Sequence, residues 1–306
     1  MLSKSNHNFT SPLPGTGPNR AHKRAVRDGT RWRAGRFSWA IDGLAPVLVM
    51  GIVNVTPDSF SDGGQHNSTP ASLIHAERLA FEGAQILDIG GESTRPGARV
   101  VSVQEELDRV LPVVETLVAR GHCVSIDTRK TTVMRAAIAA GAAIVNDVMA
   151  LADAGAVQTC AANDVGIVLM HMQGAPGTMQ VDPAYTDVVA EVGDFLLERA
   201  TLCEAAGIAR DRIALDAGFG FGKTFKHNLE LTRRLHELVA FGYPVLAGWS
   251  RKRTLGTLTG RDVPAERVHA SVAAALACVA QGAQIVRVHD VAATVDALKV
   301  WQAFTA

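Results

Sequence analysis

The stretch Glu82–Asp88, "EGAQILD", joins the end of a helical pattern to a short apolar run through a single glycine. The same joint recurs as "AGAAIVND" from Ala140 and as "QGAQIVRV" from Gln281. In each copy the glycine stands where helices commonly end, and an apolar run typical of a buried strand follows at once. The recurrence predicts a chain built from repeated helix and strand units.

Eight apolar runs of strand length alternate with longer segments of helical period between Phe37 and the C-terminus. The predicted strands cover residues 46–54, 84–91, 122–128, 142–148, 166–172, 212–218, 243–250 and 283–290, and the clearest predicted helices cover 70–82, 103–119, 131–140, 185–206 and 264–280. This alternation favours parallel strands joined by crossover helices. Eight such units in about 270 residues predict an eight-stranded parallel α/β TIM barrel. The alternative, an open doubly wound sheet, usually has fewer strands.

The composition is that of an ordinary globular protein of 306 residues, 47% hydrophobic and 20% charged. Its 30 basic residues are balanced by 30 acidic ones, so we expect neither nucleic acid nor a membrane surface as a partner. The longest apolar runs are too short to span a bilayer. The four cysteines lie far apart without a C-x-x-C pair, which argues against a zinc ribbon or a disulfide scaffold and favours the cytoplasm.

The first 36 residues differ from the rest, being rich in Pro, Gly, Asn and Arg without apolar periodicity. We interpret residues 1–36 as a mostly disordered basic tail and residues 37–306 as one catalytic domain. An Arg-rich leader poor in acidic residues also resembles an organelle transit peptide, and this alternative stays open.

Polar residues follow the predicted strands, and in a barrel the C-terminal ends of the strands meet on one face, where active sites are built. For Asp147 or Thr128 alone, a role as helix cap or turn former is the better interpretation. Arg287 and Asp216 differ because they interrupt apolar strands, where a charge is costly unless it is paired or faces a ligand. The full set at the strand ends is Asn54, Asp88, Asp127, Asn146, His171, Asp216, Lys252, Arg287 and His289.

This set suggests two kinds of chemistry. Asp127, Asn146 and Asp216 are suited to a flat heterocycle with adjacent donor and acceptor atoms, because such a site rejects ligands that leave its polar groups unpaired. Donors for a phosphate-like anion come from Thr94, Arg95, Lys252, Arg287 and His289. Asn54 offers a neutral oxygen of the kind that Mg²⁺ accepts when substrate phosphate and water supply its other ligands.

One further motif points elsewhere. The stretch Asp216–Thr224, "DAGFGFGKT", ends like a nucleotide-binding P-loop, although Ala217 stands where that motif usually has glycine. A P-loop nucleotide-binding protein is therefore an alternative hypothesis. ATP binding that survives loss of Asp216 but not of Lys223 would favour it.

The chain from about Phe37 onward closely resembles the dihydropteroate synthase family, the folate-pathway transferases that sulfonamide drugs inhibit. The resemblance rests on "MGIVNVTPDSFSDGG", "DIGGESTRPGA", "SIDT", "NDV", "LMHMQGAPGTMQ", "DAGFGFGKT", "GWSRK" and "RVHDV", in this order. It implies condensation of hydroxymethyl-dihydropterin diphosphate with p-aminobenzoate, with Mg²⁺ as cofactor and a homodimer as the assembly. In this setting Asp216 is the functional residue of "DAGFGFGKT", and Lys223 is expected to be a solvated loop residue.

The resemblance also implies residue roles. Asp127, Asn146, Asp216 and Lys252 would hold the pterin, whereas Asn54, Arg95, Arg287 and His289 would receive the diphosphate and its Mg²⁺. Asp58 and Thr94 would lie on loops that close over the site, and Asp58, Thr94, Arg95 and Lys252 are the candidate catalytic residues. Replacing Lys252 or Arg287 with Ala is predicted to reduce turnover with little loss of folding.

One position departs from the family pattern. Many relatives follow "SRK" with Ser, whereas this chain has Arg253, which bears on how the p-aminobenzoate carboxylate is bound. Two further alternatives stay open beside the P-loop. A pterin-binding methyltransferase barrel would share the heterocycle site but has no use for the phosphate-binding residues. A non-catalytic scaffold has no use for a cluster of buried charges.

Overall fold

The computed structural model describes residues 31–42, 45–56, 68–93, 99–174 and 177–305. The strands are β1 (Arg31–Ala34), β2 (Phe37–Ala40), β3 (Leu48–Asn54), β4 (Ile86–Gly90), β5 (Val124–Asp127), β6 (Ile144–Asp147), β7 (Gly166–Met170), β8 (Ile213–Asp216), β9 (Val245–Ala247) and β10 (Ile285–Val288). The helices are α1 (Ser68–Phe81), α2 (Val103–Ala119), α3 (Thr131–Ala139), α4 (Ala156–Ala161), α5 (Val188–Ala205), α6 (Phe225–Arg233), α7 (Leu235–Val239), α8 (Arg253–Thr259), α9 (Val268–Ala280) and α10 (Val291–Thr305). Short 3-10 helices cover Arg210–Arg212 and Pro264–Arg267.

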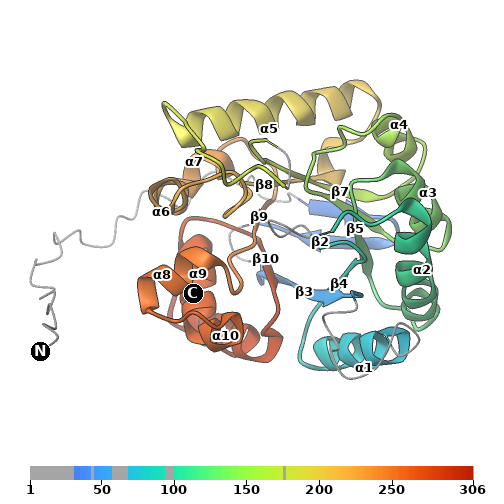
Figure 1. Ribbon diagram of the computed structural model, residues 1–306, viewed down its shortest axis with the longest axis horizontal. Coiled ribbons are helices and arrows are strands. Elements are labelled where there is room, and N and C mark those ends of the chain that lie inside the picture. Colours follow the sequence, from blue (N-terminus) through green and yellow to red (C-terminus); the bar gives the residue numbers. More distant parts are fainter. Residues whose placement is uncertain (1–30, 43–44, 57–67, 94–98, 175–176, 306) are drawn as a thin grey trace, which may run out of the picture.

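Strands β3 to β10 form a closed barrel of parallel strands. Each strand pairs with the next along the chain, and β10 closes the ring by pairing with both β9 and β3. The helices surround the strands as an outer layer (Figure 1). Because the sheet has no open edge, the prediction of an eight-stranded TIM barrel is confirmed and the open doubly wound sheet is excluded.

Side chains alternate between the two faces of each barrel strand, as the strand period of two requires. Leu87 and Ile89 of β4 point outward and belong to the large apolar core shared with the helices. Ile86 of the same strand points inward, where it packs in a smaller core with Met50 and Ile144. The barrel interior is therefore a packed apolar core at the N-terminal end of the strands.

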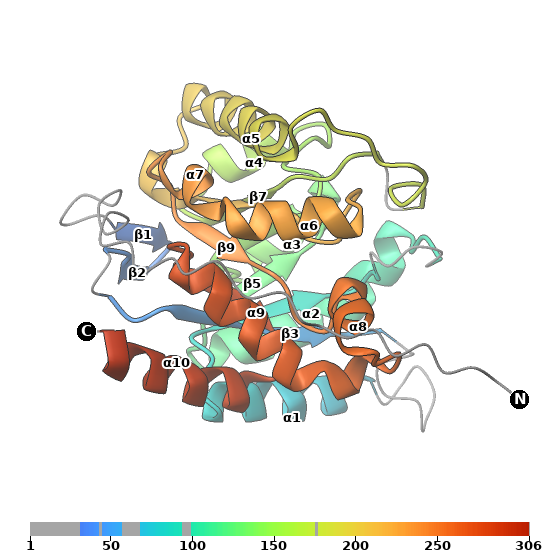
Figure 2. The same ribbon diagram turned by 90° about the vertical axis from the view of Figure 1, so that its left-hand side faces the viewer.

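A β-hairpin of β1 and β2 closes that N-terminal end, at the left of Figure 2. Trp32 is fully buried, and its Nε1 donates to the Arg212 carbonyl oxygen at 3.3 Å. A Cβ added at Gly166, where β7 begins, would lie 2.8 Å from the Ala34 Cβ, so the hairpin packs directly on the barrel. Residues 31–36, assigned to the tail from composition, therefore belong to the folded domain; residues 1–30 lie outside the described residues.

Side-chain caps mark the N-terminal ends of two of the helices predicted from the sequence. Helix α2 has the predicted bounds, and its N-cap Ser102 accepts a hydrogen bond from the Glu105 amide at 3.1 Å. Helix α5 begins at Val188, three residues later than predicted, because the Asp187 carboxylate caps the amides of Val189 and Ala190.

No single helix among the described residues is long and apolar enough to cross a membrane. One pair, Arg253–Thr259 with Pro264–Ala280, passes the same test of length and composition only when taken together, and it is bent by 76°.

Candidate active site

The inward face of the barrel changes from apolar to polar towards the C-terminal ends of the strands. Asp88 lies two residues after the inward-facing Ile86, and Arg287 lies two residues after the inward-facing Ile285. Asp127 and Asn146 are direct partners across β5 and β6. The polar residues that continue this inward face are Asn54, Asp88, Asp127, Asn146, Asp216 and Arg287, and we call them the polar floor.

Arg287 is the central cation of the polar floor. Its Nε donates to Asp88 Oδ2 at 2.6 Å, and its Nη2 donates to Asp127 Oδ2 at 2.6 Å. Asn146 Nδ2 also donates to Asp88 Oδ2, at 3.1 Å. Asp88 is fully buried, and its other oxygen, Oδ1, has no hydrogen-bond partner among the described residues. One buried carboxylate oxygen of the polar floor, Asp88 Oδ1, therefore lacks a hydrogen-bond donor among the described residues.

Burial and neighbouring charges have opposite effects on the pKa values of Asp127 and Arg287. Burial raises the pKa of the Asp127 carboxyl to about 7, against the lowering effect of Arg287. Burial by itself would lower the pKa of Arg287, but Asp88 and Asp127 raise it above its ordinary value. The guanidinium therefore keeps its charge, and it favours the ionised form of the Asp127 carboxyl.

A second group of polar residues lies on the β8 and β9 side of the barrel. The Asp216 carboxylate accepts a hydrogen bond from the Gly218 amide at 2.8 Å, and Lys252 Nζ donates to the Phe219 carbonyl oxygen. A Cβ added at Gly248 would lie 3.8 Å from Asp216 Oδ2 and 4.0 Å from Lys252 Nζ, so both side chains approach the same point of the backbone. Burial lowers the pKa of Lys252 to about 8, while Asp216 opposes that shift.

His289 follows Arg287 on the inward face at the end of β10, and Asn54 is the member of the polar floor at the end of β3. His289 Nδ1 lies 2.9 Å from Ser250 Oγ, and its backbone amide donates to the same hydroxyl at 3.0 Å. This double contact fixes the imidazole at the end of β10. Asn54 Oδ1 lies near Gly90, where an added Cβ would be 3.8 Å from it and 3.8 Å from Asp127 Oδ2.

Within the described residues, no three His, Cys, Asp or Glu side chains gather to hold a metal ion by themselves. A neutral amide oxygen beside the site fits Mg²⁺ only where a substrate anion and water supply most of the ligands. Asn54 at the end of β3 suits that arrangement.

Of the remaining residues named from the sequence, two have hydrogen-bond partners within the protein and three lie outside the described residues. Asp147 is a turn former, as expected, since its carboxylate accepts hydrogen bonds from the Met149 and Leu151 amides at 2.8 and 2.7 Å. The Thr128 hydroxyl donates to the Glu106 carboxylate at 2.6 Å, so Thr128 has a hydrogen-bond partner within the protein. The predicted residues Asp58, Thr94 and Arg95 lie outside the described residues.

The expectation of a solvated Lys223 is wrong. Only 3% of this residue is exposed, and its Nζ points into the protein, 3.0 Å from His171 Nδ1 and 3.0 Å from the Phe221 carbonyl oxygen. Sequence reasoning missed this because a lysine after five alternating glycines and phenylalanines has no local signal of burial. It also left Asp88 without a role, although its position inside an apolar strand carried such a signal.

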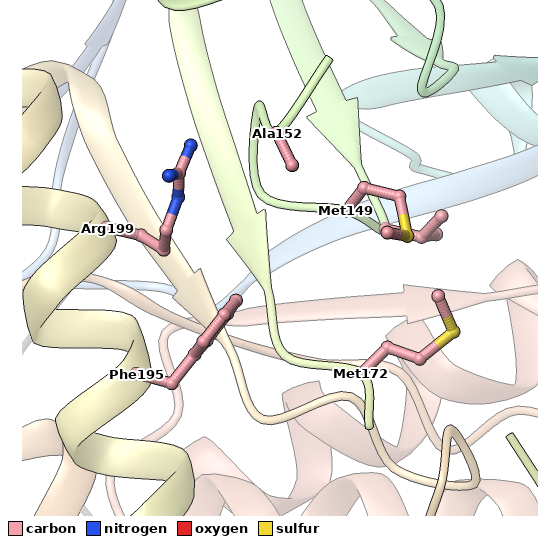
Figure 3. A pocket seen from close by; sticks show the side chains of 6 residues that line it. Met149, Ala152, Met172, Phe195 and Arg199 are labelled. Atoms are coloured by element: carbon pink, nitrogen blue, oxygen red, sulfur yellow. The ribbon is translucent and has the colours of Figure 1, made fainter. Parts of the chain in front are cut away.

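A cavity of about 140 Å³ lies beside the end of β6 (Figure 3). Phe195 and Arg199 of α5 line one side of it, and Met149 and Met172 line the other. The Arg199 guanidinium is already bound to the carbonyl oxygens of Ala150 and Leu151, at 2.9 Å each. The cavity is therefore largely apolar and separate from the polar floor.

Comparisons with known proteins agree with this geometry. The family described as "Pterin binding enzyme" matches residues 50–289. The dihydropteroate synthase of Neisseria meningitidis serogroup B is 58% identical over 278 residues, covering 89% of this chain and 96% of that protein. The dihydropteroate synthase of Xanthomonas albilineans, solved with 4-aminobenzoic acid, is 57% identical with a TM-score of 0.82, over 86% of this chain and 94% of that chain.

The Xanthomonas albilineans enzyme has also been solved in complex with 7,8-dihydropteroate. That structure is 52% identical to this chain and has a TM-score of 0.82, over 90% of this chain and 99% of that chain. Family match, identity and fold thus agree over the whole barrel. The chain belongs to the pterin-binding enzymes, within the dihydropteroate synthase family.

Proposed function

We propose that this chain condenses hydroxymethyl-dihydropterin diphosphate with p-aminobenzoate, giving dihydropteroate and diphosphate. The observation that carries the proposal is the polar floor, in which carboxylates, an amide and a guanidinium from separate strands meet at the C-terminal end of the barrel. The relatives solved with 4-aminobenzoic acid and with 7,8-dihydropteroate support these substrates.

The pterin ring is assigned to Asp127, Asn146, Asp216 and Lys252. A pterin presents a ring N–H group and an adjacent exocyclic amino group, and carboxylates accept hydrogen bonds from both. Its ring also has acceptor atoms, to which an amide or an ammonium can donate. Asp216 Oδ2 and Lys252 Nζ both lie within 4.0 Å of a Cβ built at Gly248, so acceptor and donor groups lie at neighbouring positions. A ligand without these edges would leave buried polar groups unpaired, which gives the site its selectivity.

The diphosphate is assigned to Arg287 and His289, and its Mg²⁺ to Asn54. Arg287 uses two of its five N–H groups on Asp88 and Asp127, so further N–H groups remain for an anion. Thr94 and Arg95 are proposed to add donors from the β4 loop, and Asp58 to act from the β3 loop. Bound Mg²⁺ would supply positive charge that makes diphosphate a better leaving group.

The proposed reaction requires little proton transfer by side chains of the protein. An arylamine is nucleophilic while neutral, so no strong general base is required. Lys252, with its pKa of about 8, keeps most of its charge at neutral pH and would donate hydrogen bonds to acceptor atoms of the bound pterin. Arg287 holds the leaving anion, and closure over the site would exclude water, which competes with the amine.

We also propose a homodimer in the cytoplasm. Helices α9 and α10 lie side by side (Figure 2), and Leu276, Val300, Trp301 and Phe304 line an apolar groove between them. Phe304 is 86% exposed in the single chain, which a second copy would cover. The four cysteines are buried and unpaired, in keeping with a reducing compartment.

The alternatives lose support at specific residues. A P-loop would aim Lys223 at nucleotide phosphates, whereas its ammonium is turned inward and bound to protein acceptors. A pterin-binding methyltransferase would share the ring-binding residues but would need no cation and histidine for a diphosphate.

The test is diphosphate release by the purified protein with the dihydropterin diphosphate, Mg²⁺ and p-aminobenzoate, omitting each component in turn. Release that requires all three, forms dihydropteroate and is blocked by a sulfonamide is the expected result. Tight pterin binding without release would instead favour the methyltransferase or scaffold interpretation.

A further inference from the structure

Lys223 has three hydrogen-bond partners although it is buried. Its Nζ lies 3.0 Å from His171 Nδ1, 3.0 Å from the Phe221 carbonyl oxygen and 3.3 Å from the His171 carbonyl oxygen. The two carbonyl oxygens accept hydrogen bonds from Nζ, His171 Nδ1 is its third polar partner, and burial lowers the pKa of Lys223 well below its ordinary value. In the described part of the chain, Lys223 forms no ion pair with a carboxylate, so it is held by neutral groups.

These contacts join two segments that are in backbone contact. A Cβ at Gly218 would lie 1.9 Å from the His171 carbonyl oxygen, and one at Gly222 would lie 2.5 Å from the Gln173 carbonyl oxygen. Tyr185 closes the same junction by donating its hydroxyl to the Gly222 carbonyl oxygen at 2.7 Å. The segment after β7 and the loop after β8 therefore form one packed unit, with the Lys223 ammonium between them.

The same loop holds two of the groups assigned to the pterin. Its Gly218 amide donates to Asp216, and its Phe219 carbonyl oxygen accepts from Lys252 Nζ. Lys252 Nζ also lies 4.6 Å from the centroid of the Phe221 ring, next to the carbonyl that Lys223 binds. A shift of this loop would therefore displace a carboxylate and an ammonium of the site together.

We infer that Lys223 is a positioning residue for the pterin subsite. It anchors the loop after β8 to His171 and thereby sets the places of Asp216 and Lys252, without touching the substrate. This inference rests on the proposed function, because it assumes that Asp216 and Lys252 bind the ring. It gives the lysine of "DAGFGFGKT" a role that is neither solvation nor phosphate binding.

The decisive measurement separates the two substrates. Lys223→Met keeps the apolar stem and removes the Nζ contacts to His171 and Phe221. The displacement of Asp216 and Lys252 that follows should raise KM for the dihydropterin diphosphate about tenfold or more. KM for p-aminobenzoate should change less than about twofold because that substrate is not bound by the displaced groups. Lys226→Met is the matched control, since Lys226 is exposed three residues further on. An unchanged pterin KM, or an equal rise for both substrates, overturns the inference.

A second variant covers failure of Lys223→Met to fold. His171→Phe removes the Nδ1 acceptor and keeps a ring that can pack on Phe195, which meets the His171 ring edge-on at 5.0 Å. It should raise the pterin KM in the same selective way, and a wild-type pterin KM would overturn the inference. Absence of turnover in the wild-type protein would instead refute the proposed function, and pterin binding of both proteins by calorimetry would then decide the role of Lys223.

Discussion

Arg287 and the fully buried Asp88 form an ion pair between the last and second strands of the barrel. The Nε to Oδ2 distance is 2.6 Å, and the residues are 199 positions apart in the chain. The pair therefore exists only once β10 has closed the ring against β3 and its neighbours. Closure of the barrel therefore brings the Arg287 cation to the Asp88 carboxylate in the candidate site.

Replacing Arg287 with Ala should destabilise the protein as well as reduce turnover. The change leaves Asp88 buried without its cation, a loss of about 3–5 kcal/mol in the free energy of unfolding. This revises the sequence-based expectation of little effect on folding. Urea unfolding measures it, and adding Asp88→Asn to Arg287→Ala should restore part of the stability. Equal stability of wild type and Arg287→Ala would show that the pair contributes nothing.

Replacing Lys252 with Ala should act mainly on turnover. Lys252 forms no ion pair within the described part of the chain, and removing a partly buried cation without an ion pair costs the fold little. Loss of its charged hydrogen bonds to substrate should reduce kcat/KM for the dihydropterin diphosphate about ten- to hundredfold. Steady-state kinetics and a thermal melt test both statements, with Lys226→Ala as control. Unaltered kinetics would remove Lys252 from the site.

The pKa of about 8 at Lys252 predicts opposite pH trends for activity and stability. Activity needs the ammonium, so kcat/KM should fall above about pH 8. Stability behaves differently because the folded pKa lies below the unfolded value of about 10.4. The free-energy cost of burying the Lys252 charge is present below about pH 8 and is relieved as the pH rises from about 8 to about 10.4. Lys252→Met should lack both trends in pH-rate profiles and urea unfolding, and a variant that keeps them would assign them to other groups.

Removal of Mg²⁺ by a chelator should abolish diphosphate release, and added Mg²⁺ should restore it. Asn54→Ala should raise the Mg²⁺ concentration for half-maximal rate about tenfold, the effect expected for loss of one favourable ligand contact. Asn163→Ala, at an exposed position beyond α4, is the control. If Asn54→Ala keeps the wild-type Mg²⁺ dependence, Asn54 is not the metal ligand.

Replacing Trp32 with Ala should affect stability and spare the chemistry. Trp32 is fully buried at the N-terminal end of the barrel, away from the strand ends that carry the polar floor. We expect a loss of about 3–5 kcal/mol, as for other large core residues truncated to Ala. Urea unfolding tests this, and the 93% exposed Phe81 provides the control Phe81→Ala. A selective rise in pterin KM would contradict the assignment of the hairpin to structure alone.

The candidate site could be predicted from the sequence where its signal was local. A charge inside an apolar strand, as at Asp216 and Arg287, shows up without any fold because burial makes it costly. The direction of each side chain also follows from a period of two, once one residue of the strand is placed. Lys223 could not be placed in this way, because its acceptors on His171 lie 52 positions away.

The sequence by itself determined the order of strands and helices, the closed barrel that this order implies, and the end of the strands where polar groups gather. These properties depend on hydrophobic periodicity and on glycines between neighbouring elements, which act over a few residues. Tertiary structure alone decided that Arg287 pairs with Asp88 and Asp127, that Lys223 turns inward, and that the hairpin of β1 and β2 closes the barrel. Those contacts join residues distant in the chain, and burial fixes them only when the strands have closed into a ring.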